Sequence, residues 1–116
     1  MTDSTQDLTR LFITEADQEK PAVNKNFPRL YGHTLCPFVE KARMSLAAHN
    51  VVHQRVEVDL GKKTKWHIDI NGGLVPIFEL PDGTTLLESK VLMEYADEAY
   101  PDQGYSLLPS DPVKRA

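Results

Sequence analysis

The junction at Cys36 and Pro37 constrains the fold more than any other stretch, because a strand pattern ends just before it and a helix pattern begins just after it. The short apolar run over 29–32 predicts a strand, and the amphipathic spacing over 37–49 predicts a helix. Proline favours the first position of a helix, where its missing N–H would have no partner. The sequence therefore predicts that Cys36 lies at or just before a helix N-terminus.

Strand and helix patterns continue to alternate after this junction. Apolar and polar residues alternate over 52–60, which predicts a second strand. The later patterns predict a short helix over 62–70, a hairpin of strands over 75–80 and 84–87, and a helix over 89–99. The first strand–helix–strand unit gives a parallel, right-handed pair. We therefore predict a thioredoxin-like α/β fold of order βαβ-α-ββα, with a four-stranded mixed sheet and helices on both faces.

The chain divides into one domain with a segment on either side. The regular pattern occupies 29–104, an ordinary length for a small domain. The preceding 1–28 is predicted to be an N-terminal extension, partly disordered, in which the apolar residues of 8–13 make a short helix or strand packed on the domain. The prolines within 105–116 predict a linker.

Charge and cysteine content exclude several classes of function. The formal net charge of −4 argues against a nucleic-acid partner held by bulk charge. One cysteine allows no intramolecular disulfide, and no apolar run is long enough for a membrane span, so we expect a cytoplasmic protein. The four histidines lack ligand-like spacing, so no metal site is expected.

Cys36 is the candidate nucleophile. A helix N-terminus stabilises a thiolate through its free N–H groups and its dipole; the alternative is a small buried apolar residue, as free cysteines often are. No second cysteine stands three positions further on, so the available chemistry is monothiol exchange, in which the thiolate enters a mixed disulfide. An external thiol must then resolve that disulfide, which requires a binding site for a small thiol.

Val75 and Pro76 suggest one wall of such a site. They stand at the start of a predicted strand. A cis bond there would turn the backbone N–H and carbonyl of Val75 outward, where a peptide-like ligand could pair with them as a short added strand. An ordinary trans proline at a strand start is the alternative.

Glu88 and Ser89 suggest a second wall. Ser89 is a good N-cap for the helix that follows, and the same N-terminus can bind a carboxylate. Glu88 beside it can accept an ammonium group, so the pair suits the α-amino acid end of a γ-glutamyl peptide. One lysine of the run Lys62, Lys63 and Lys65 could meet a terminal carboxylate, although such runs are usually solvated.

These residues resemble the glutathione transferases, and most of all the omega class with its cysteine-type active site. The resemblance extends over about 29–116 and rests on strings that share their order and spacing with the family: Leu35-Cys36-Pro37-Phe38 through Arg43, Leu74-Val75-Pro76-Ile77, Leu86-Leu87-Glu88-Ser89, Tyr95 to Pro101, and Leu107 to Pro112. It implies that 29–104 is the N-terminal, thioredoxin-like glutathione-binding domain, with glutathione as cosubstrate.

The resemblance also implies a role for each candidate residue. Cys36 would form a mixed disulfide with glutathione, and Phe38 would line the pocket near the thiol. The Val75-Pro76 pair, with its proline cis, would bind the cysteinyl backbone of glutathione. The Glu88-Ser89 pair would hold the γ-glutamyl end, and Lys63 would reach the glycine carboxylate.

Two departures from the family affect these expectations. The string Asn71-Gly72-Gly73 is one residue shorter than the family's usual string before Leu74, which alters this loop and the register at Lys63. The chain ends at Ala116, where the family's all-helical second domain would begin, so 105–116 is expected to be a linker toward an absent domain. In the family that second domain supplies most of the wall for the hydrophobic substrate and much of the dimer contact.

Two function classes follow from the resemblance. The first is a glutathione transferase acting as a glutathione-dependent thiol transferase through Cys36, on a disulfide or an electrophilic substrate, with dehydroascorbate reduction as a related activity. A cysteine favours redox exchange because a thiolate is itself a nucleophile. The second class is a non-catalytic interaction or assembly domain. A homodimer is compatible with both.

Overall fold

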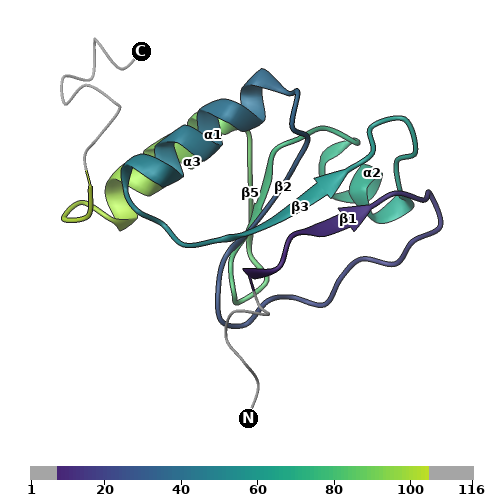
Figure 1. Ribbon diagram of the computed structural model, residues 1–116, viewed down its shortest axis with the longest axis horizontal. Helices are drawn as coiled ribbons and strands as arrows, with labels where there is room; N and C mark the ends of the chain where they lie inside the picture. Colours follow the sequence, from purple (N-terminus) through teal and green to yellow (C-terminus); the bar gives the residue numbers. More distant parts are fainter. Residues whose placement is uncertain (1–7, 105–116) are drawn as a thin grey trace.

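Five strands and three helices make up the fold over the described residues. The computed structural model describes residues 8–104 (Figure 1); residues 1–7 of the predicted N-terminal extension and the linker expected at 105–116 lie outside them. The strands are β1 (Leu11–Ile13), β2 (Arg29–Gly32), β3 (Gln54–Val58), β4 (Ile77–Glu79) and β5 (Thr85–Leu87). The helices are α1 (Pro37–Ala48), α2 (Lys65–Asn71) and α3 (Ser89–Ala99). The predicted order of elements over 29–99 is confirmed.

The sheet is mixed and has the order β1-β3-β2-β4-β5. β1 and β2 each pair with β3 in parallel, whereas β2–β4 and β4–β5 are antiparallel. The α/β architecture is as predicted, but the sheet has five strands where the sequence predicted four. The extra strand is β1, whose register places Ile13 beside Val58. Three residues are too few to display a strand period, which is why the sequence left helix and strand open here.

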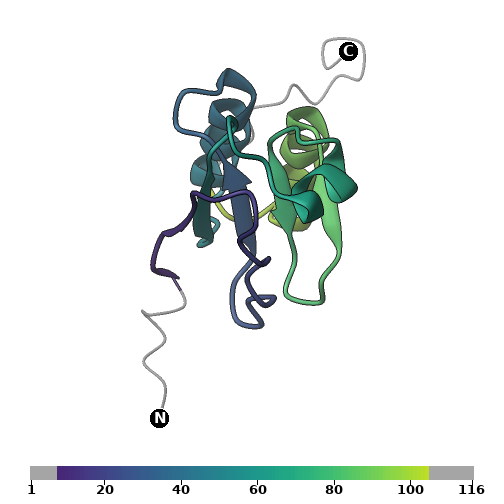
Figure 2. The ribbon, with the colours of Figure 1, turned by 90° about the vertical axis from the view of Figure 1, so that its right-hand side faces the viewer.

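Helices cover both faces of the sheet, as predicted. α1 and α3 lie side by side on one face, and α2 lies on the other (Figures 1 and 2). Neighbouring strand residues point to opposite faces. Leu30 therefore packs in the cluster that holds the buried side chains of α1 and α3, whereas Tyr31 packs in the cluster that contacts Trp66 of α2. The helix α2 begins at Lys65, later than predicted, because Thr64 is its N-cap and accepts a hydrogen bond from the His67 N–H.

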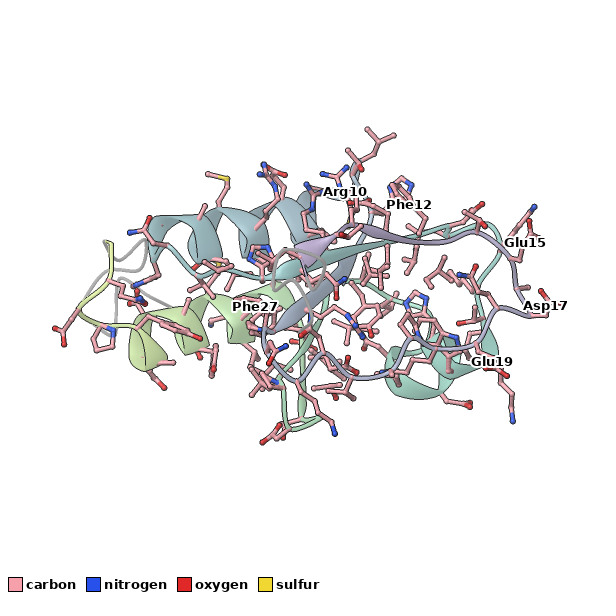
Figure 3. All side chains as sticks on the ribbon, turned by 60° about the horizontal axis from the view of Figure 1, so that its bottom comes forward. Arg10, Phe12, Glu15, Asp17, Glu19 and Phe27 are labelled. Carbon is pink, nitrogen blue, oxygen red and sulfur yellow. The ribbon has the colours of Figure 1, made fainter. Side chains whose placement is uncertain are left out.

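The segment between β1 and β2 is joined to the α2 side of the domain (Figure 3). The indole N–H of Trp66 donates to the carbonyl of Gln18 over 2.9 Å. Further along the segment, the Lys20 ammonium lies 2.5 Å from the Glu79 carboxylate. The other Glu79 oxygen accepts from Arg29 and from the Tyr31 hydroxyl, at 3.2 and 3.0 Å. Burial, chiefly, raises the pKa of Tyr31 far above its ordinary value, so the hydroxyl stays a donor.

A second tight contact joins the end of α1 to the turn after α3. His49 is buried, with Nε2 2.9 Å from the Asp97 carboxylate and Nδ1 2.9 Å from the carbonyl oxygens of Tyr100 and Gln103. Burial alone would lower the pKa of His49, but the hydrogen bonds to Asp97 and to the two carbonyls outweigh it and raise that pKa. The protonated imidazole, with a donor on each nitrogen, is the form that fits these acceptors.

The stability contributed by His49 is expected to depend on pH. Because the pKa of His49 is raised in the fold, its contribution is fully present below the ordinary histidine pKa of about 6.5. It is lost as the pH rises through the higher folded-state value. Urea unfolding of the wild type and of Asp97→Asn should therefore differ most at mildly acidic pH, and the gap should narrow in alkaline buffer. A gap that stays constant with pH would contradict this account.

Gly104 is expected to tolerate no side chain. Its φ is +62°, and a Cβ added there would lie 1.6 Å from the Ala48 carbonyl oxygen. Gly72 is a matched control, since its φ is +61° with nothing within 4 Å of an added Cβ. Gly104→Ala should therefore lower the free energy of unfolding by about 2 kcal/mol more than Gly72→Ala does, as overpacking commonly costs. Denaturant titration of both variants measures the difference, and equal losses would show that the turn yields.

Candidate functional site

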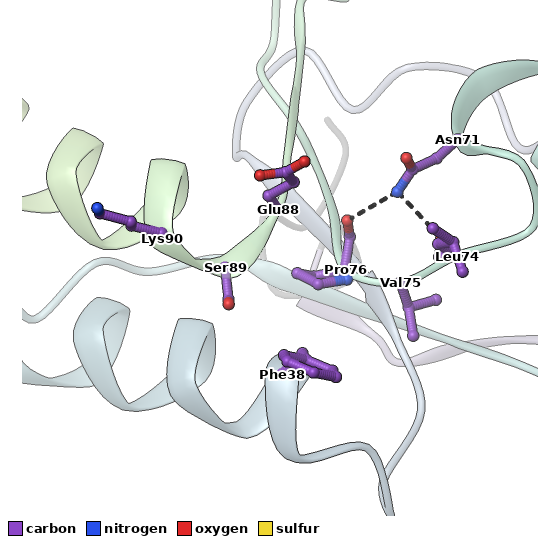
Figure 4. A pocket seen from close by; sticks show the side chains of 8 residues that line it. All are labelled: Phe38, Asn71, Leu74, Val75, Pro76, Glu88, Ser89 and Lys90. Atoms are coloured by element: carbon purple, nitrogen blue, oxygen red, sulfur yellow. Dashed lines mark hydrogen bonds between the residues drawn. The ribbon is translucent and has the colours of Figure 1, made fainter.

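A hollow of about 300 Å³ opens between the first turns of α1 and α3 and the loop before β4 (Figure 4). We call it the main hollow; its volume lies at the lower end of the range for small-molecule sites. It brings together five of the candidate residues, which are Phe38, Val75, Pro76, Glu88 and Ser89. Its other lining residues are Asn71, Leu74 and Lys90, none of which was predicted to be a site residue.

Sheet topology explains why residues so distant in sequence meet here. β4 is antiparallel to both β2 and β5, with Ile77 opposite Tyr31 on one side and Leu87 on the other. The ends of β2 and β5 therefore meet the start of β4 at one edge of the sheet. The residues just beyond these strand ends, including Val75 and Glu88, are the ones that line the hollow.

Cys36 lies where the sequence predicts, as the N-cap of α1 with Pro37 as the first helical residue. It is half-buried, its side chain makes no capping hydrogen bond, and it packs against the cluster under α1 and α3. It is not among the residues that line the main hollow, whereas Phe38, in the same turn, is. The thiol therefore stands beside the hollow and keeps part of its surface in the core.

The Val75–Pro76 bond is cis, which is the alternative that the family resemblance implied, and β4 begins at Ile77, two residues after the predicted strand start at 75. The Asn71 side-chain amide donates to the carbonyl oxygens of Leu74 and Pro76, over 3.2 and 3.4 Å (Figure 4). The Leu74 carbonyl also lies 2.8 Å from Nε2 of His67. Among the described residues, neither backbone group of Val75 has a hydrogen-bond partner, so both are available to a ligand.

α3 begins at Ser89, as the sequence predicts, but its N-cap differs from the expectation by one residue. Ser89 was expected to be the N-cap, but Glu88 takes that position and Ser89 is the first helical residue. The reason is the backbone of Glu88, whose φ of +72° and ψ of +136° cannot continue a helix. Glu88 is exposed and makes no side-chain capping bond. The Ser89 hydroxyl points toward α1 (Figure 4).

Two lysines lie near the main hollow in different ways. Lys63 does not line it, but its side chain lies over Gly73, since a Cβ added there would be 2.7 Å from Cδ and 3.2 Å from Nζ of the lysine. Lys90 does line it, with its ammonium directed along α3 away from Pro76 (Figure 4). Its position directly after the Glu88-Ser89 pair was the sequence signal that could have identified it.

Residues 8–104 hold no group of three or more histidine, cysteine, aspartate or glutamate side chains placed to bind a metal ion. Within the same span, the longest helices are too short or too polar to cross a membrane.

The family model and the similar curated proteins all point to glutathione S-transferases. Residues 30–104 match the family described as glutathione S-transferase, N-terminal domain. Glutathione S-transferase omega-1 of Sus scrofa is 39% identical over 89 residues, covering 76% of this chain and 36% of that protein. Human glutathione S-transferase omega-2 is 32% identical over 111 residues, covering 95% of this chain and 44% of that protein. The chain thus spans less than half the length of these relatives.

Solved structures agree with the sequence comparison. Glutathione transferase Omega 3C of Trametes versicolor superposes with a TM-score of 0.65 at 36% identity, covering 76% of this chain and 40% of that one. A rice glutathione transferase solved in complex with glutathione gives a TM-score of 0.63 at 26% identity, covering 72% of this chain and 37% of that one.

The positive φ of Glu88 is expected to lower the stability of the fold. A non-glycine residue at φ +72° is strained, whereas glycine adopts this conformation freely. Glu88→Gly should therefore unfold with a free energy about 1 kcal/mol higher than Glu88→Ala, because both lose the carboxylate and only glycine relieves the strain. Urea titration of the pair decides the matter. Equal stabilities would mean that the backbone relaxes in the alanine variant.

Proposed function

This chain belongs to the glutathione S-transferase family, and we propose that it is an omega-like, glutathione-dependent thiol transferase that acts through Cys36. The observation that carries the proposal is the main hollow, which gathers a free strand-like backbone, a carboxylate and a helix N-terminus beside the chain's one thiol. Similarity to omega-class relatives over most of this chain supports the proposal, and so does a structural neighbour solved with glutathione.

Each part of glutathione has a matching group in or beside the main hollow. The N–H and carbonyl of Val75, beside Pro76, would pair with the cysteinyl backbone as a short added strand. Glu88 would accept the α-ammonium group, and Ser89 with the free N–H groups of α3 would bind the α-carboxylate. Lys63, which lies over Gly73, would meet the glycine carboxylate. Phe38 would pack against the ligand near the thiol.

The reaction proceeds in two exchanges that balance without a further oxidant or reductant. The Cys36 thiolate attacks the glutathionyl sulfur of a mixed disulfide; the new S–S bond joins Cys36 to glutathione, and the released thiolate takes a proton from water. A second glutathione, as thiolate, then attacks the glutathionyl sulfur, which forms glutathione disulfide and returns the Cys36 thiolate. The net reaction converts the mixed disulfide and one free glutathione into the substrate thiol and glutathione disulfide, so one disulfide bond is broken for each one formed. A disulfide is the favoured acceptor, since the chain's own cysteine is the nucleophile.

Cys36 and Glu88 should affect different kinetic parameters. In a hydroxyethyl-disulfide assay with glutathione, Cys36→Ser should fall to the uncatalysed rate because the nucleophile is gone. Glu88→Gln should keep the thiol but raise the KM for glutathione, because it loses the charge that accepts the ammonium group.

The control is Glu98→Gln, which removes an exposed carboxylate at the far end of α3. Its kinetics should match the wild type. If Cys36→Ser retained the wild-type rate, the thiol transferase proposal would be wrong and the assembly-domain alternative would take its place. If Glu88→Gln left the KM unchanged, the γ-glutamyl end would bind elsewhere.

A further inference from the structure

The loop that carries Cys36 is shaped mainly by its own hydrogen bonds. This thiol loop, residues 33–36, joins β2 to α1. The Cys36 N–H donates to the His33 carbonyl over 3.1 Å, and the Leu35 N–H donates to His33 Nδ1 over 3.2 Å. These bonds fix the shape of the loop but do not attach it to the neighbouring strand. Leu35 does not attach it there either, since its side chain is 84% exposed; the buried contact of the loop is that of Cys36 with the cluster under α1 and α3.

One side-chain contact supplies that attachment. The Thr34 hydroxyl donates to Oε2 of Glu57 over 2.9 Å. Glu57 lies on β3 directly opposite Gly32, the last residue of β2, so the loop passes beside the carboxylate as it leaves the sheet. Among residues 8–104, this is the one side-chain hydrogen bond between the thiol loop and another element.

The carboxylate that receives this bond is itself held in place. Oε1 of Glu57 pairs with Arg55 over 2.8 Å, and the Glu57 side chain is only 13% exposed. Arg55 and Glu57 are two apart on one strand, so both side chains project from the same face. A hydrogen bond to an ionised acceptor is stronger than one between neutral groups. The carboxylate is therefore a fixed acceptor for the loop.

We propose that Thr34 and Glu57 are positioning residues for Cys36, holding the thiol loop so that the sulfur meets the disulfide bound in the main hollow. The inference rests on the proposed thiol transferase function. Neither residue lines the main hollow; both line a separate opening of about 380 Å³ along β1 and β3. Their effect on the reaction is therefore exerted through the placement of the sulfur and not through contact with glutathione.

Because Thr34 and Glu57 act only through the placement of the Cys36 sulfur, the rate of thiol exchange and the affinity for glutathione can change independently. Exchange requires the attacking sulfur to approach the disulfide at a restricted distance and direction, and small misplacements are costly. Loosening the thiol loop should slow the exchange step and leave glutathione affinity unchanged. A merely structural role would lower stability and affinity together, or would change neither rate nor affinity.

The experiment compares two pairs of variants with one control. Thr34→Val removes the hydroxyl with little change of shape, whereas Thr34→Ser keeps it. Glu57→Leu removes the acceptor; Glu57→Gln retains a hydrogen bond to Thr34 in either amide orientation, because a hydroxyl both donates and accepts. Thr84→Val is the control, since Thr84 lies in the exposed hairpin turn.

Three readouts are taken on the full chain. Mass spectrometry follows the rate at which glutathione disulfide converts Cys36 to its glutathione adduct in a single turnover. Calorimetry gives the affinity for reduced glutathione. Amide hydrogen exchange of residues 33–36 reports how firmly the loop is held.

Thr34→Val and Glu57→Leu should slow adduct formation by about tenfold, with faster exchange in the loop and an unchanged affinity for glutathione. Thr34→Ser and Glu57→Gln should restore most of the rate, and Thr84→Val should match the wild type. If the wild type reacts and Thr34→Val reacts equally fast, or if rate and affinity fall in parallel, the positioning role is wrong while the proposed function stands. A wild type that forms no adduct overturns the proposed function and, with it, this role.

Discussion

The antiparallel pairing of β4 with β2 and β5 is the constraint on which the rest of the structure depends. Tyr31, Ile77 and Leu87 lie in register across these three strands. Reversing the direction of β4 would carry its N-terminal end, and the Val75-Pro76 pair with it, to the opposite edge of the sheet. The end of β2 delivers the thiol loop to the same edge. The site is thus a consequence of strand direction, and the helices then supply N-termini to it.

The other end of these strands explains what holds them in register. Arg29 and Glu79 are opposite each other on β2 and β4, and their side chains are almost completely buried. Removing one partner of such a pair would leave a buried charge without compensation, which is far costlier than losing a surface ion pair. Gln54 of β3 extends the network, because its Oε1 accepts from Arg29 Nε over 2.9 Å. The residues that line the main hollow and the buried network of Arg29, Glu79 and Gln54 therefore lie at opposite ends of the same strands. Neither one disturbs the packing of the other.

The sequence predicts the fold well where side-chain period and turn chemistry agree. Pro37 predicts the start of α1 correctly, and the alternation around Val56 predicts β3. It fails where tertiary contacts decide: β1 is a strand only because β3 offers it an edge. At α3, the predicted start at Ser89 is correct, but the positive φ of Glu88 makes that residue the N-cap in place of Ser89, and no side-chain preference encodes that angle. Asn71 was not predicted to be a site residue, because its bonds to the loop before β4 depend on a fold that sequence alone does not display.

Glu88 and Leu35 each have a feature that lowers the stability of the fold beside the main hollow. A glutamate with a positive φ and a leucine exposed to solvent both lower the free energy of unfolding. Residues held in rare backbone conformations concentrate at functional sites. Glycine at position 88 would relieve the strain but remove the carboxylate that faces the main hollow. A polar residue at 35 would be better solvated, yet an apolar side chain beside the thiol offers surface to an acceptor. The thiol loop can expose Leu35 and still be held to β3, because the Thr34 hydroxyl donates to the Glu57 carboxylate.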